Sequence, residues 1–494
     1  MSQSKAVLRA LTSGFTFEPK AFDLISSLPP EVDADVLVDA LLRRKASAGG
    51  DSKHITEDDV KRVVPSDAPG AGGPVEVQPE LEEPADVEVV SDPTPAIAPI
   101  EAFQGYAKLF RDRYDRLLSV VKKRPDTRGV GTTSAGRAAA QGQRVKVAGL
   151  LSNRVNRRER VEVTIDDPSG TLKVLCQDEA VVKAAMEAPL DGMVVLEVSR
   201  SRTGQLYANT FTLPDVPDRR ASGASHRAYA VLLSDLHIGS KMFLADDFER
   251  FIQWINGKHG DPDIVGRIKY VVIAGDLVDG VGVYPGQEHQ LSDRNPRSQY
   301  EIAAKLLERI PARVQIVVGP GNHDAVRQAL PQPAVAPDMA ESLYKMENVR
   351  WVGDPAYVRL QGVTFLIYHG KSLDDVIATT PDLAYSKPVD AMRLLLRSRH
   401  LAPTYGKRTA VSPEPRDFMV IDPVPDVFHG GHVHAYGEAN YRGTLIVNSG
   451  TWQAQTDFQS NMGLEPTPSI IPVVDLSDLS VTRRSFGAAG FPAA

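Results

Sequence analysis

The chain has 494 residues and a formal net charge of −7, so it is long enough for two or three domains. This mildly acidic balance excludes a global basic field, and any nucleic-acid site must be a local patch. The single cysteine, Cys176, excludes a disulfide framework and fits a reducing compartment. No apolar run has the length of a membrane span and no signal-peptide core is present, so we expect a cytoplasmic protein that makes no membrane contact.

Residues 1–64 are predicted to form a small helical domain. Apolar residues recur at helical spacing in 6–11 and 34–42, and Thr56 with the three residues after it forms a capping box for a third helix. Residues 65–99 are rich in Pro, Gly, Glu and Asp and almost lack aromatic residues. We interpret them as a disordered acidic linker, because such a composition buries too little surface to order itself.

Residues 100–143 are predicted to be a helix and a loop that lead into a barrel. Aromatic and aliphatic residues recur every three or four positions between Phe103 and Val121, and Pro125 ends the helix. A stripe of this kind is more often a packing surface than a cofactor site.

Residues 144–217 have the pattern of an OB-fold domain, a small barrel that often binds oligonucleotides. Short alternating strands with one helical insert are expected at 144–148, 161–165, 172–176, 179–186 (the helix), 193–198 and 206–213. Four arginines crowd the connection between the first two strands: Arg154, Arg157, Arg158 and Arg160. They form either a solvated loop or a patch that follows a phosphate backbone, and both interpretations stay open.

Five apolar segments in the second half of the chain each end in metal-binding residue types. The segments are 229–234, 270–275, 313–318, 363–368 and 426–428. Buried strands of open α/β sheets place their ligands at their carboxyl ends. The candidate ligands at these ends are Asp235, His237, Asp276, Asn322, His369, His432 and His434.

Oxygen and imidazole ligands without thiolates indicate a hard or borderline divalent cation. Seven ligands are too many for one ion but suit two ions ~4 Å apart that share a bridging carboxylate, clamp a phosphate and generate hydroxide near neutral pH. His323 then remains beside the cluster, where it could protonate a leaving oxygen as a general acid. Asp324 either orients His323 or caps a surface turn.

Helices are expected between these strands, at 246–256 and 299–309, with a further packing helix at 390–400. A turn-rich loop at 280–288 should lie at the mouth of the site. The domain built from these strands and helices is expected to span 227–460, followed by a C-terminal tail at 461–494.

The order D-x-H, G-D, G-N-H-D, H-G, G-H-x-H resembles the calcineurin-like metallophosphoesterase family. The resemblance implies an α/β fold with a β-sandwich flanked by helices. It implies one metal held by Asp235, His237, Asp276 and His434. A second metal would be held by Asp276 as the bridge, with Asn322, His369 and His432, and His323 would be the catalytic histidine.

A barrel ahead of a phosphoesterase domain, with the loop at 282–288, resembles the small subunits of archaeal family D DNA polymerase. That resemblance implies a 3′→5′ proofreading exonuclease with two divalent ions, most simply Mn²⁺. The implied partners are the large catalytic subunit, DNA with a single-stranded or mismatched 3′ end, and a sliding clamp. Two alternatives remain: a catalytically vestigial structural subunit, and a phosphodiesterase of small molecules.

Overall fold

The computed structural model describes residues 15–18, 20–21, 54–56, 59–60, 85–97, 102–158, 160–461 and 463–487. The chain divides into two compact units, residues 1–80 and residues 81–494. Within the described residues, no helix has both the length and the apolar character needed to cross a membrane.

The first unit contains a short parallel strand pair that the sequence pattern did not predict. Strands β1 (Thr16–Phe17) and β2 (His54–Ile55) pair in parallel. The predicted capping box is present: the backbone N–H of Thr56 donates to Asp59 Oδ2 at 2.9 Å, and that of Asp59 donates to Thr56 Oγ1 at 3.3 Å. The predicted helices at 6–11 and 34–42 lie outside the described residues.

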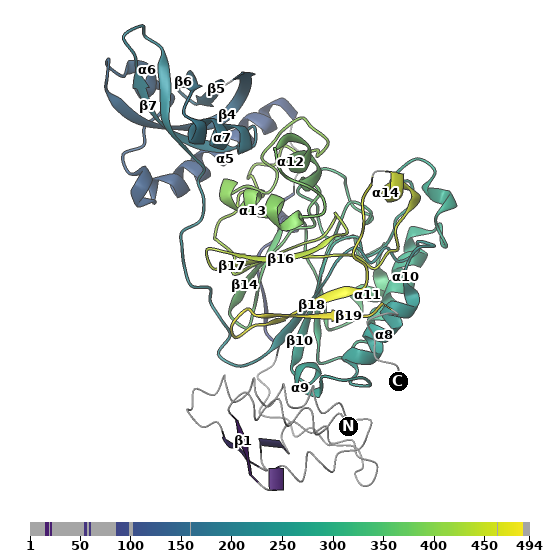
Figure 1. The fold of residues 1–494 in the computed structure, drawn as a ribbon. Helices are drawn as coiled ribbons and strands as arrows, with labels where there is room; N and C mark the ends of the chain where they lie inside the picture. The colour runs from purple at the N-terminus through teal and green to yellow at the C-terminus, as the bar shows by residue number, and fades with distance from the viewer. Residues whose placement is uncertain are drawn as a thin grey trace. The chain divides into compact units, whose positions relative to one another are not determined.

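The second unit is built around two six-stranded sheets (Figure 1). The first has the order β12-β11-β10-β9-β18-β19, and its four strands from β12 to β9 are parallel. The bounds are β9 Tyr229–Leu233, β10 Ile268–Ala274, β11 Gln315–Gly319, β12 Val349–Trp351, β18 Ile470–Asp475 and β19 Val481–Ser485.

The second sheet has the order β16-β17-β15-β14-β13-β3, with β14, β15 and β17 parallel. The bounds are β3 Val87–Ser91, β13 Ala356–Leu360, β14 Val363–Ile367, β15 Val427–Gly430, β16 Tyr436–Tyr441 and β17 Thr444–Ser449. All five strands predicted to end in candidate ligands are present, as β9, β10, β11, β14 and β15.

The apolar runs of these strands are explained by burial on both faces. In β9, Ala230 and Leu232 pack between the two sheets, whereas Val231 and Leu233 pack beneath the helices on the outer side. Each of these side chains is at most 1% exposed, and burying a Val or Leu fully contributes roughly 1.5–3 kcal/mol. A strand buried on both faces needs no polar alternation, and its carboxyl end is held rigidly.

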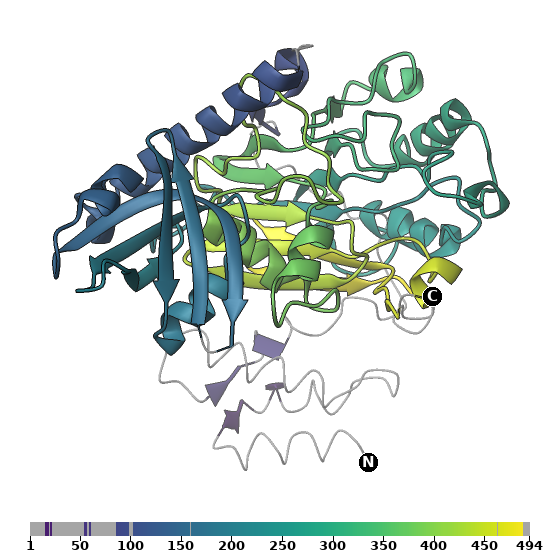
Figure 2. The ribbon, with the colours of Figure 1, turned by 90° about the horizontal axis from the view of Figure 1, so that it is seen from above.

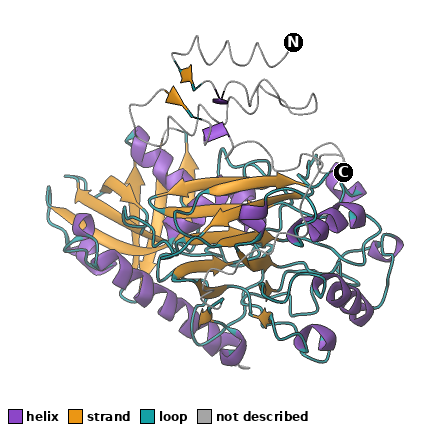
Figure 3. Ribbon diagram, turned by 90° about the horizontal axis from the view of Figure 1, so that it is seen from below, coloured by secondary structure: helices purple, strands orange, loops and turns teal. Residues whose placement is uncertain are grey.

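Helices cover the outer faces of the sandwich (Figures 1 and 3). On the first sheet, α8 and α10 bury Phe251 and Tyr300 in the outer core, and on the second sheet α13 buries Met392 and Leu395. The bounds are α8 Ala245–Ile255, α9 Pro262–Val265, α10 Pro296–Leu307, α11 Glu341–Tyr344, α12 Leu373–Thr379, α13 Pro388–Ser398 and α14 Asp457–Asn461. The helices predicted at 246–256, 299–309 and 390–400 correspond to α8, α10 and α13.

A five-stranded closed barrel precedes the sandwich, with strand order β4-β5-β6-β8-β7 and β7 pairing back to β4. The bounds are β4 Arg144–Arg157, β5 Arg160–Asp167, β6 Gly170–Cys176, α7 Glu179–Glu187, β7 Met193–Arg200 and β8 Leu206–Thr212. Helix α7 is capped by Asp178 and buries Val181 and Ala185 in the barrel core. The predicted barrel and its helical insert are therefore present.

Helix α5 (Ala102–Lys122) runs beside the barrel, as Figure 2 shows, and also contacts the sandwich domain. Its Arg113 is 1% exposed and donates from Nε to Asp417 Oδ2 at 2.8 Å. The 3-10 helix η2 (Pro125–Thr127) and helix α6 (Thr133–Ala138) then lead into β4.

The linker prediction is wrong for residues 85–97. Residues Val87–Ser91 form β3, which extends the second sheet by antiparallel pairing with β13, and η1 (Thr94–Ala96) follows it. An edge strand needs no core of its own, because the neighbouring strand supplies its hydrogen-bond partners. The remaining residues of the predicted linker, 65–84 and 98–99, lie outside the described residues.

The prediction of a separate tail after residue 460 is also wrong for residues 470–485. Strand β18 pairs with β9, the strand that carries Asp235, and β19 pairs with β18. Phe486 is 1% exposed and packs its ring against Trp254 and Trp452. These residues therefore belong to the sandwich domain.

Candidate metal centre

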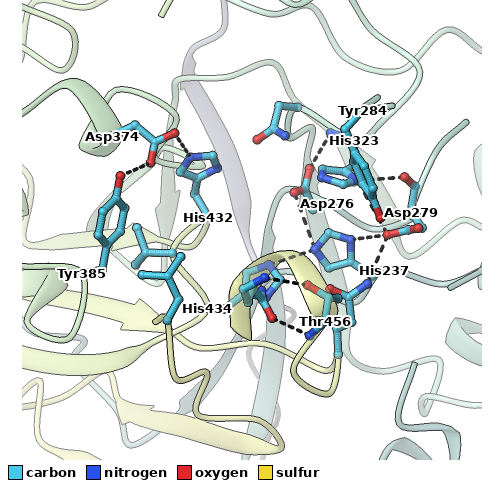
Figure 4. A pocket seen from close by; sticks show the side chains of 15 residues that line it. His237, Asp276, Asp279, Tyr284, His323, Asp374, Tyr385, His432, His434 and Thr456 are labelled. Carbon is cyan, nitrogen blue, oxygen red and sulfur yellow. Dashed lines mark hydrogen bonds and ion pairs between the residues drawn. The ribbon is translucent and has the colours of Figure 1, made fainter. Parts of the chain in front are cut away.

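The carboxyl ends of five strands, three from one sheet and two from the other, bring the candidate ligands to one place. Figure 4 labels four of them, His237, Asp276, His432 and His434. The first sheet supplies Asp235, His237, Asp276 and Asn322, and the second supplies His369, His432 and His434. Three sets of ligand atoms lie within 4.8 Å of one another: Asp235, His237 and His434; His237, Asp276 and His323; and Asp235, Asp276 and His369.

Five of the seven candidate ligands have a left-handed backbone. The φ angles are 53° at Asp235, 52° at His237, 51° at Asp276, 72° at His432 and 57° at His434. This conformation is uncommon outside glycine, and residues held in it cluster at functional sites. The folded sandwich therefore holds these residues in a conformation that they would seldom adopt by themselves.

The first predicted ligand group surrounds one point. His237 Nε2 lies 3.0 Å from His434 Nε2, 3.7 Å from Asp276 Oδ2 and 4.0 Å from Asp235 Oδ1. His434 Nε2 is 3.4 Å from Asp235 Oδ1. Two imidazole nitrogens and two carboxylate oxygens thus face each other at distances that a shared cation would explain.

The second predicted group adjoins it through Asp276. His369 Nε2 lies 3.3 Å from Asp276 Oδ2 and 3.1 Å from Asn322 Oδ1. The backbone N–H of His432 donates to Asp235 Oδ2 at 3.0 Å, and its ring Nε2 lies 3.2 Å from Asp374 Oδ2. His432 therefore has Nδ1 left for a ligand role.

The electrostatics of the centre favour bound cations. Burial would raise the pKa of Asp276, but the charges of His369 and His323 hold it well below its usual range. Burial would likewise raise the pKa of Asp235, but its hydrogen bond to His434 lowers it. Burial would lower the pKa of His369, whereas Asp276 raises it, to a net value of about 10. The two buried carboxylates thus favour their charged forms, and Asp276 draws positive charge onto His369, as expected of a cation site.

Glycines let the backbone approach these carboxylates. A Cβ atom on Gly321 would lie 2.2 Å from Asp276 Oδ1, and one on Gly431 would lie 2.3 Å from Asp235 Oδ2. These glycines leave room for the carboxylates beside the cluster. The donor set, its charge and its spacing fit two divalent cations.

Asp279, which sequence reasoning missed, orients His237. Its Oδ1 lies 2.8 Å from His237 Nδ1, so Nε2 is left to face the centre. Gln287 and Gln453 donate to the Asp279 side chain at 3.3 Å each. The signal was available in the sequence, since Asp279 stands three residues after Asp276.

The ring of His323 lies at the edge of the cluster and lines the pocket. Its Nδ1 lies 2.8 Å from the carbonyl oxygen of Asp279, so Nδ1 carries a proton and Nε2 is the nitrogen available for proton transfer. Its backbone N–H donates to Asp276 Oδ1 at 2.8 Å, which fixes the ring beside a candidate bridging ligand.

Asp324 neither orients His323 nor caps a surface turn, so both interpretations of this residue are wrong. It is 4% exposed and accepts hydrogen bonds from the backbone N–H groups of Leu277 at 3.2 Å and Gly321 at 2.8 Å and from the hydroxyl of Tyr300 at 3.0 Å. It therefore joins the loops after β10 and β11. Burial and the charge of Asp276 raise the pKa of Asp324 to about 6.

The centre opens into a pocket of about 220 Å³. Tyr284, from the predicted mouth loop, and Tyr385 lie on opposite sides of it (Figure 4). Tyr284 lies 6.2 Å from the His323 ring between centroids, and Tyr385 donates its hydroxyl to Asp374 Oδ1 at 3.0 Å. The prediction that residues 280–288 lie at the mouth of the site is confirmed.

Comparison with known proteins identifies the family. Residues 230–436 match the family of DNA polymerase alpha/epsilon B subunits. The chain is 38% identical over 485 residues to the DNA polymerase II small subunit of Archaeoglobus fulgidus, covering 97% of each chain. It is 40% identical over 386 residues to that of Pyrococcus furiosus, covering 77% of this chain and 63% of the relative. The chain belongs to the small-subunit family of archaeal family D DNA polymerase.

The family assignment confirms the resemblance seen in the sequence. The chain matches less than two thirds of the length of the Pyrococcus relatives, but it covers 99% of the small subunit of Halobacterium salinarum at 34% identity. A solved archaeal phosphodiesterase aligns with 52% of this chain at 14% identity and a TM-score of 0.27, too low to establish a shared fold.

Proposed function

We propose that this chain is a two-metal 3′→5′ exodeoxyribonuclease that removes mismatched nucleotides for the large subunit of a family D DNA polymerase. The observation that supports this most directly is the clustering of the candidate ligands, five of which line one open pocket together with His323. A purely structural subunit would have no need of five strained ligand backbones around two buried carboxylates.

Asp235, His237, Asp276 and His434 would hold one divalent cation, and Asp276, Asn322, His369 and His432 the other. When bound, the two ions would supply positive charge for a phosphodiester and lower the pKa of water, and Mn²⁺ fits the ligand set. Asp276 would bridge the two sites. This role is supported by its Oδ2, which lies 3.7 Å from His237 Nε2 and 3.3 Å from His369 Nε2.

His323 would protonate the 3′-oxygen that leaves from the preceding sugar, so that a 5′-mononucleotide is released. The carbonyl oxygen of Asp279 holds the proton on Nδ1 and thereby aims Nε2 at the substrate. The Asp279 carboxylate Oδ1, 3.6 Å from the same nitrogen, stabilises the charged ring before the proton is given up.

The small pocket between Tyr284 and Tyr385 favours a single unpaired end. A terminal base must leave its partner to enter, and this costs least for a mismatched or frayed end. That preference is what a proofreading enzyme requires. The large polymerase subunit is the partner expected from the family.

The test is the His323→Ala variant of the full chain with a 3′-mismatched primer. We expect hydrolysis to fall by about 10²–10⁴-fold, because the general acid is lost, while metal content stays near two ions per chain. His289→Ala is the matched control, since that imidazole is exposed and makes no contact with the cluster in the described structure; it should retain full activity.

Unchanged exonuclease activity of His323→Ala would refute this role of His323. A wild-type chain that binds metal but hydrolyses no DNA would support the structural alternative. Hydrolysis of soluble phosphodiesters without any response to DNA would support the small-molecule phosphodiesterase.

A further inference from the structure

A short loop beside the pocket, residues 404–409, presents one aromatic and two cationic side chains to solvent. Tyr405 is 40% exposed, and Lys407 and Arg408 are exposed as well. Within the described part of the chain, neither cation has a carboxylate within ion-pair distance. Lys407 and Arg408 act on the carboxylates of Asp191 and Asp374 only at longer range. Without a direct ion pair, both cations are available to an anionic partner.

The backbone of this loop is fixed at both ends. The N–H of Tyr405 donates to Asp191 Oδ2 at 3.0 Å. The N–H groups of Arg408 and Thr409 donate to the two carboxylate oxygens of Asp375 at 3.0 and 2.8 Å. The exposed side chains therefore stand on a positioned segment, which lowers the entropic cost of binding.

The loop adjoins the metal centre through α12. Asp375 follows Asp374, whose carboxylate contacts the candidate ligand His432 at 3.2 Å. Thr409 Oγ1 donates to the carbonyl oxygen of Lys371 at 3.3 Å, two residues after the candidate ligand His369.

Lys371 adds a third cation between the loop and the ligands. Its Nζ donates to the backbone carbonyl and the side-chain oxygen of Gln328, each at 2.8 Å. Gln328 in turn donates to the carbonyl oxygen of Asn322 at 2.7 Å. Lys371 is thus joined through Gln328 to the segment that carries Asn322, and its backbone is bonded to the loop that carries Lys407 and Arg408.

The Tyr405 ring is packed so that a nucleic-acid base could stack on it. Its ring contacts Tyr106 edge-on, with centroids 5.1 Å apart, and Phe110 in the same way at 5.4 Å. These contacts hold the ring at its edge while part of it stays in solvent. Exposed aromatic rings beside cations are the elements with which proteins hold single strands without sequence preference.

The surface beyond Tyr405 carries carboxylates, which would repel phosphates. A cleft of about 650 Å³ there is lined by Asp166, Asp167 and Asp191. Burial and the neighbouring carboxylate of Asp191 raise the pKa of Asp166, which shows that negative charge is already crowded. A polynucleotide that follows the cations should therefore end its contact at Tyr405.

If the arginines at the start of the barrel form a phosphate-binding patch, it contains three of the four and not Arg154. Arg154 Nη1 donates to the carbonyl oxygens of Ala185, Met186 and Ala188, and so it caps the end of α7. Only Arg157, Arg158 and Arg160 of the four are exposed at the hairpin between β4 and β5. They remain the competing site for DNA.

We propose that residues 404–409 form the track by which a single DNA strand reaches the metal centre, with phosphates on Lys407 and Arg408 and one base on Tyr405. This inference rests on the proposed nuclease function and names the route of its substrate.

The test measures binding of the full-length His323→Ala chain to fluorescein-labelled oligo-dT by anisotropy at several NaCl concentrations. For Lys407→Gln/Arg408→Gln we expect weaker binding and a log–log salt slope smaller by about 1.4, since each phosphate contact on a single strand contributes about 0.7. Tyr405→Ala should weaken binding about ten-fold and leave the slope unchanged, because stacking releases no counterions.

The matched control is Lys122→Gln/Lys123→Gln, two adjacent exposed cations at the end of α5, which should leave both affinity and slope as they were. Equal salt slopes for the loop variant and its parent would overturn the proposal. A salt slope that becomes smaller only in Arg157→Gln/Arg158→Gln would overturn it as well. Absence of oligo-dT binding at low salt, with mismatch hydrolysis retained by the wild type, would overturn the track alone. A wild type that binds metal and DNA without hydrolysing it would instead overturn the proposed function.

Discussion

Each of the four histidine rings among the candidate ligands has a protein partner on at least one nitrogen. At the residue scale these partners decide which nitrogen remains for a metal. His369 Nδ1 lies 2.9 Å from the carbonyl oxygen of Ala274, and His434 Nδ1 lies 2.7 Å from Gln459 Nε2. His237 and His432 have carboxylate partners instead, Asp279 and Asp374. Each proposed metal site thus contains one histidine that a carboxylate orients.

Asp374→Asn should weaken the second metal site selectively. The amide would no longer accept a charge-assisted hydrogen bond from His432, so the affinity for one ion should fall by about 10–100-fold. Titration with Mn²⁺, followed by calorimetry and metal analysis, should show one tight and one weakened site. Tyr385→Phe, which removes only the hydroxyl that holds Asp374, should have a smaller effect in the same direction.

Tyr441→Phe is the matched control for this pair. Tyr441 donates its hydroxyl to Asp215 at 3.1 Å and does not line the pocket, so its loss should leave both metal affinities unchanged. Two unaltered sites in Asp374→Asn would show that His432 is oriented without this carboxylate.

Sequence patterns could predict the candidate ligands but not all their partners. The candidate ligands follow strands whose apolar runs are visible in the sequence, so their positions at the strand ends could be inferred. Asp374 lies in the first turn of α12, where acidic residues are common at any helix start, and no pattern indicates that it faces His432. The prediction for Asp324 failed for a similar reason, since adjacency in sequence to His323 does not set the direction of its side chain.

At the scale of elements, α5 is joined to the sandwich domain by a buried ion pair. Arg113 and Asp417 side chains are each 1% exposed and lie 2.8 Å apart, and His400 Nε2 contacts the same carboxylate at 2.9 Å. Arg113→Met should lower the free energy of unfolding by about 3–5 kcal/mol, because it leaves a buried carboxylate without its cation. Arg111→Met, which breaks an exposed pair on the same helix, should cost only about 0.5 kcal/mol in the same urea titration.

The same cluster sets a pH dependence of stability. Burial first, and then the charge of Arg113, lower the pKa of His400 to about 4. In the unfolded chain the imidazole has a pKa of ~6.5. Between pH ~6.5 and about 4, the unfolded chain therefore binds a proton that the native state does not bind, and the native state loses stability as the pH falls. Burial would raise the pKa of Asp417, but His400 and Arg113 lower it, so its contribution is lost only under more acidic conditions. Urea unfolding at pH 7 and pH 5 should show the decrease, and His400→Gln should reduce it.

Elements that the sequence patterns did not predict are those whose stability comes from a neighbour. Strand β3 lies in a segment whose composition indicates disorder, yet β13 supplies its hydrogen bonds, and Asp92 accepts the N–H of Gly353 at 3.0 Å. The sequence of β18 looks like any short apolar segment, and only its pairing with β9 shows that it is a strand of the sheet. Long periodic segments such as α8 were predicted closely because their own pattern determines them.

At the scale of the whole sandwich domain, the candidate centre lies where two sheets meet. One sheet contributes Asp235, His237, Asp276 and Asn322, and the other contributes three histidines, so bound cations would connect both layers of the sandwich. Ligands that bind only the native state stabilise it in proportion to the logarithm of their concentration over Kd. Stability of this domain should therefore depend on metal.

Removal of metal by EDTA should lower the thermal midpoint of the full chain, and added Mn²⁺ should restore it. A free ion at a hundred times its Kd stabilises the native state by about 2.7 kcal/mol per site. Asp276→Asn removes the candidate bridge, so its midpoint should respond little to EDTA or Mn²⁺. Tyr441→Phe should keep the full response. If the wild type melts at the same temperature with chelator and with Mn²⁺, the seven side chains do not hold ions, and their strained backbones would then need another cause.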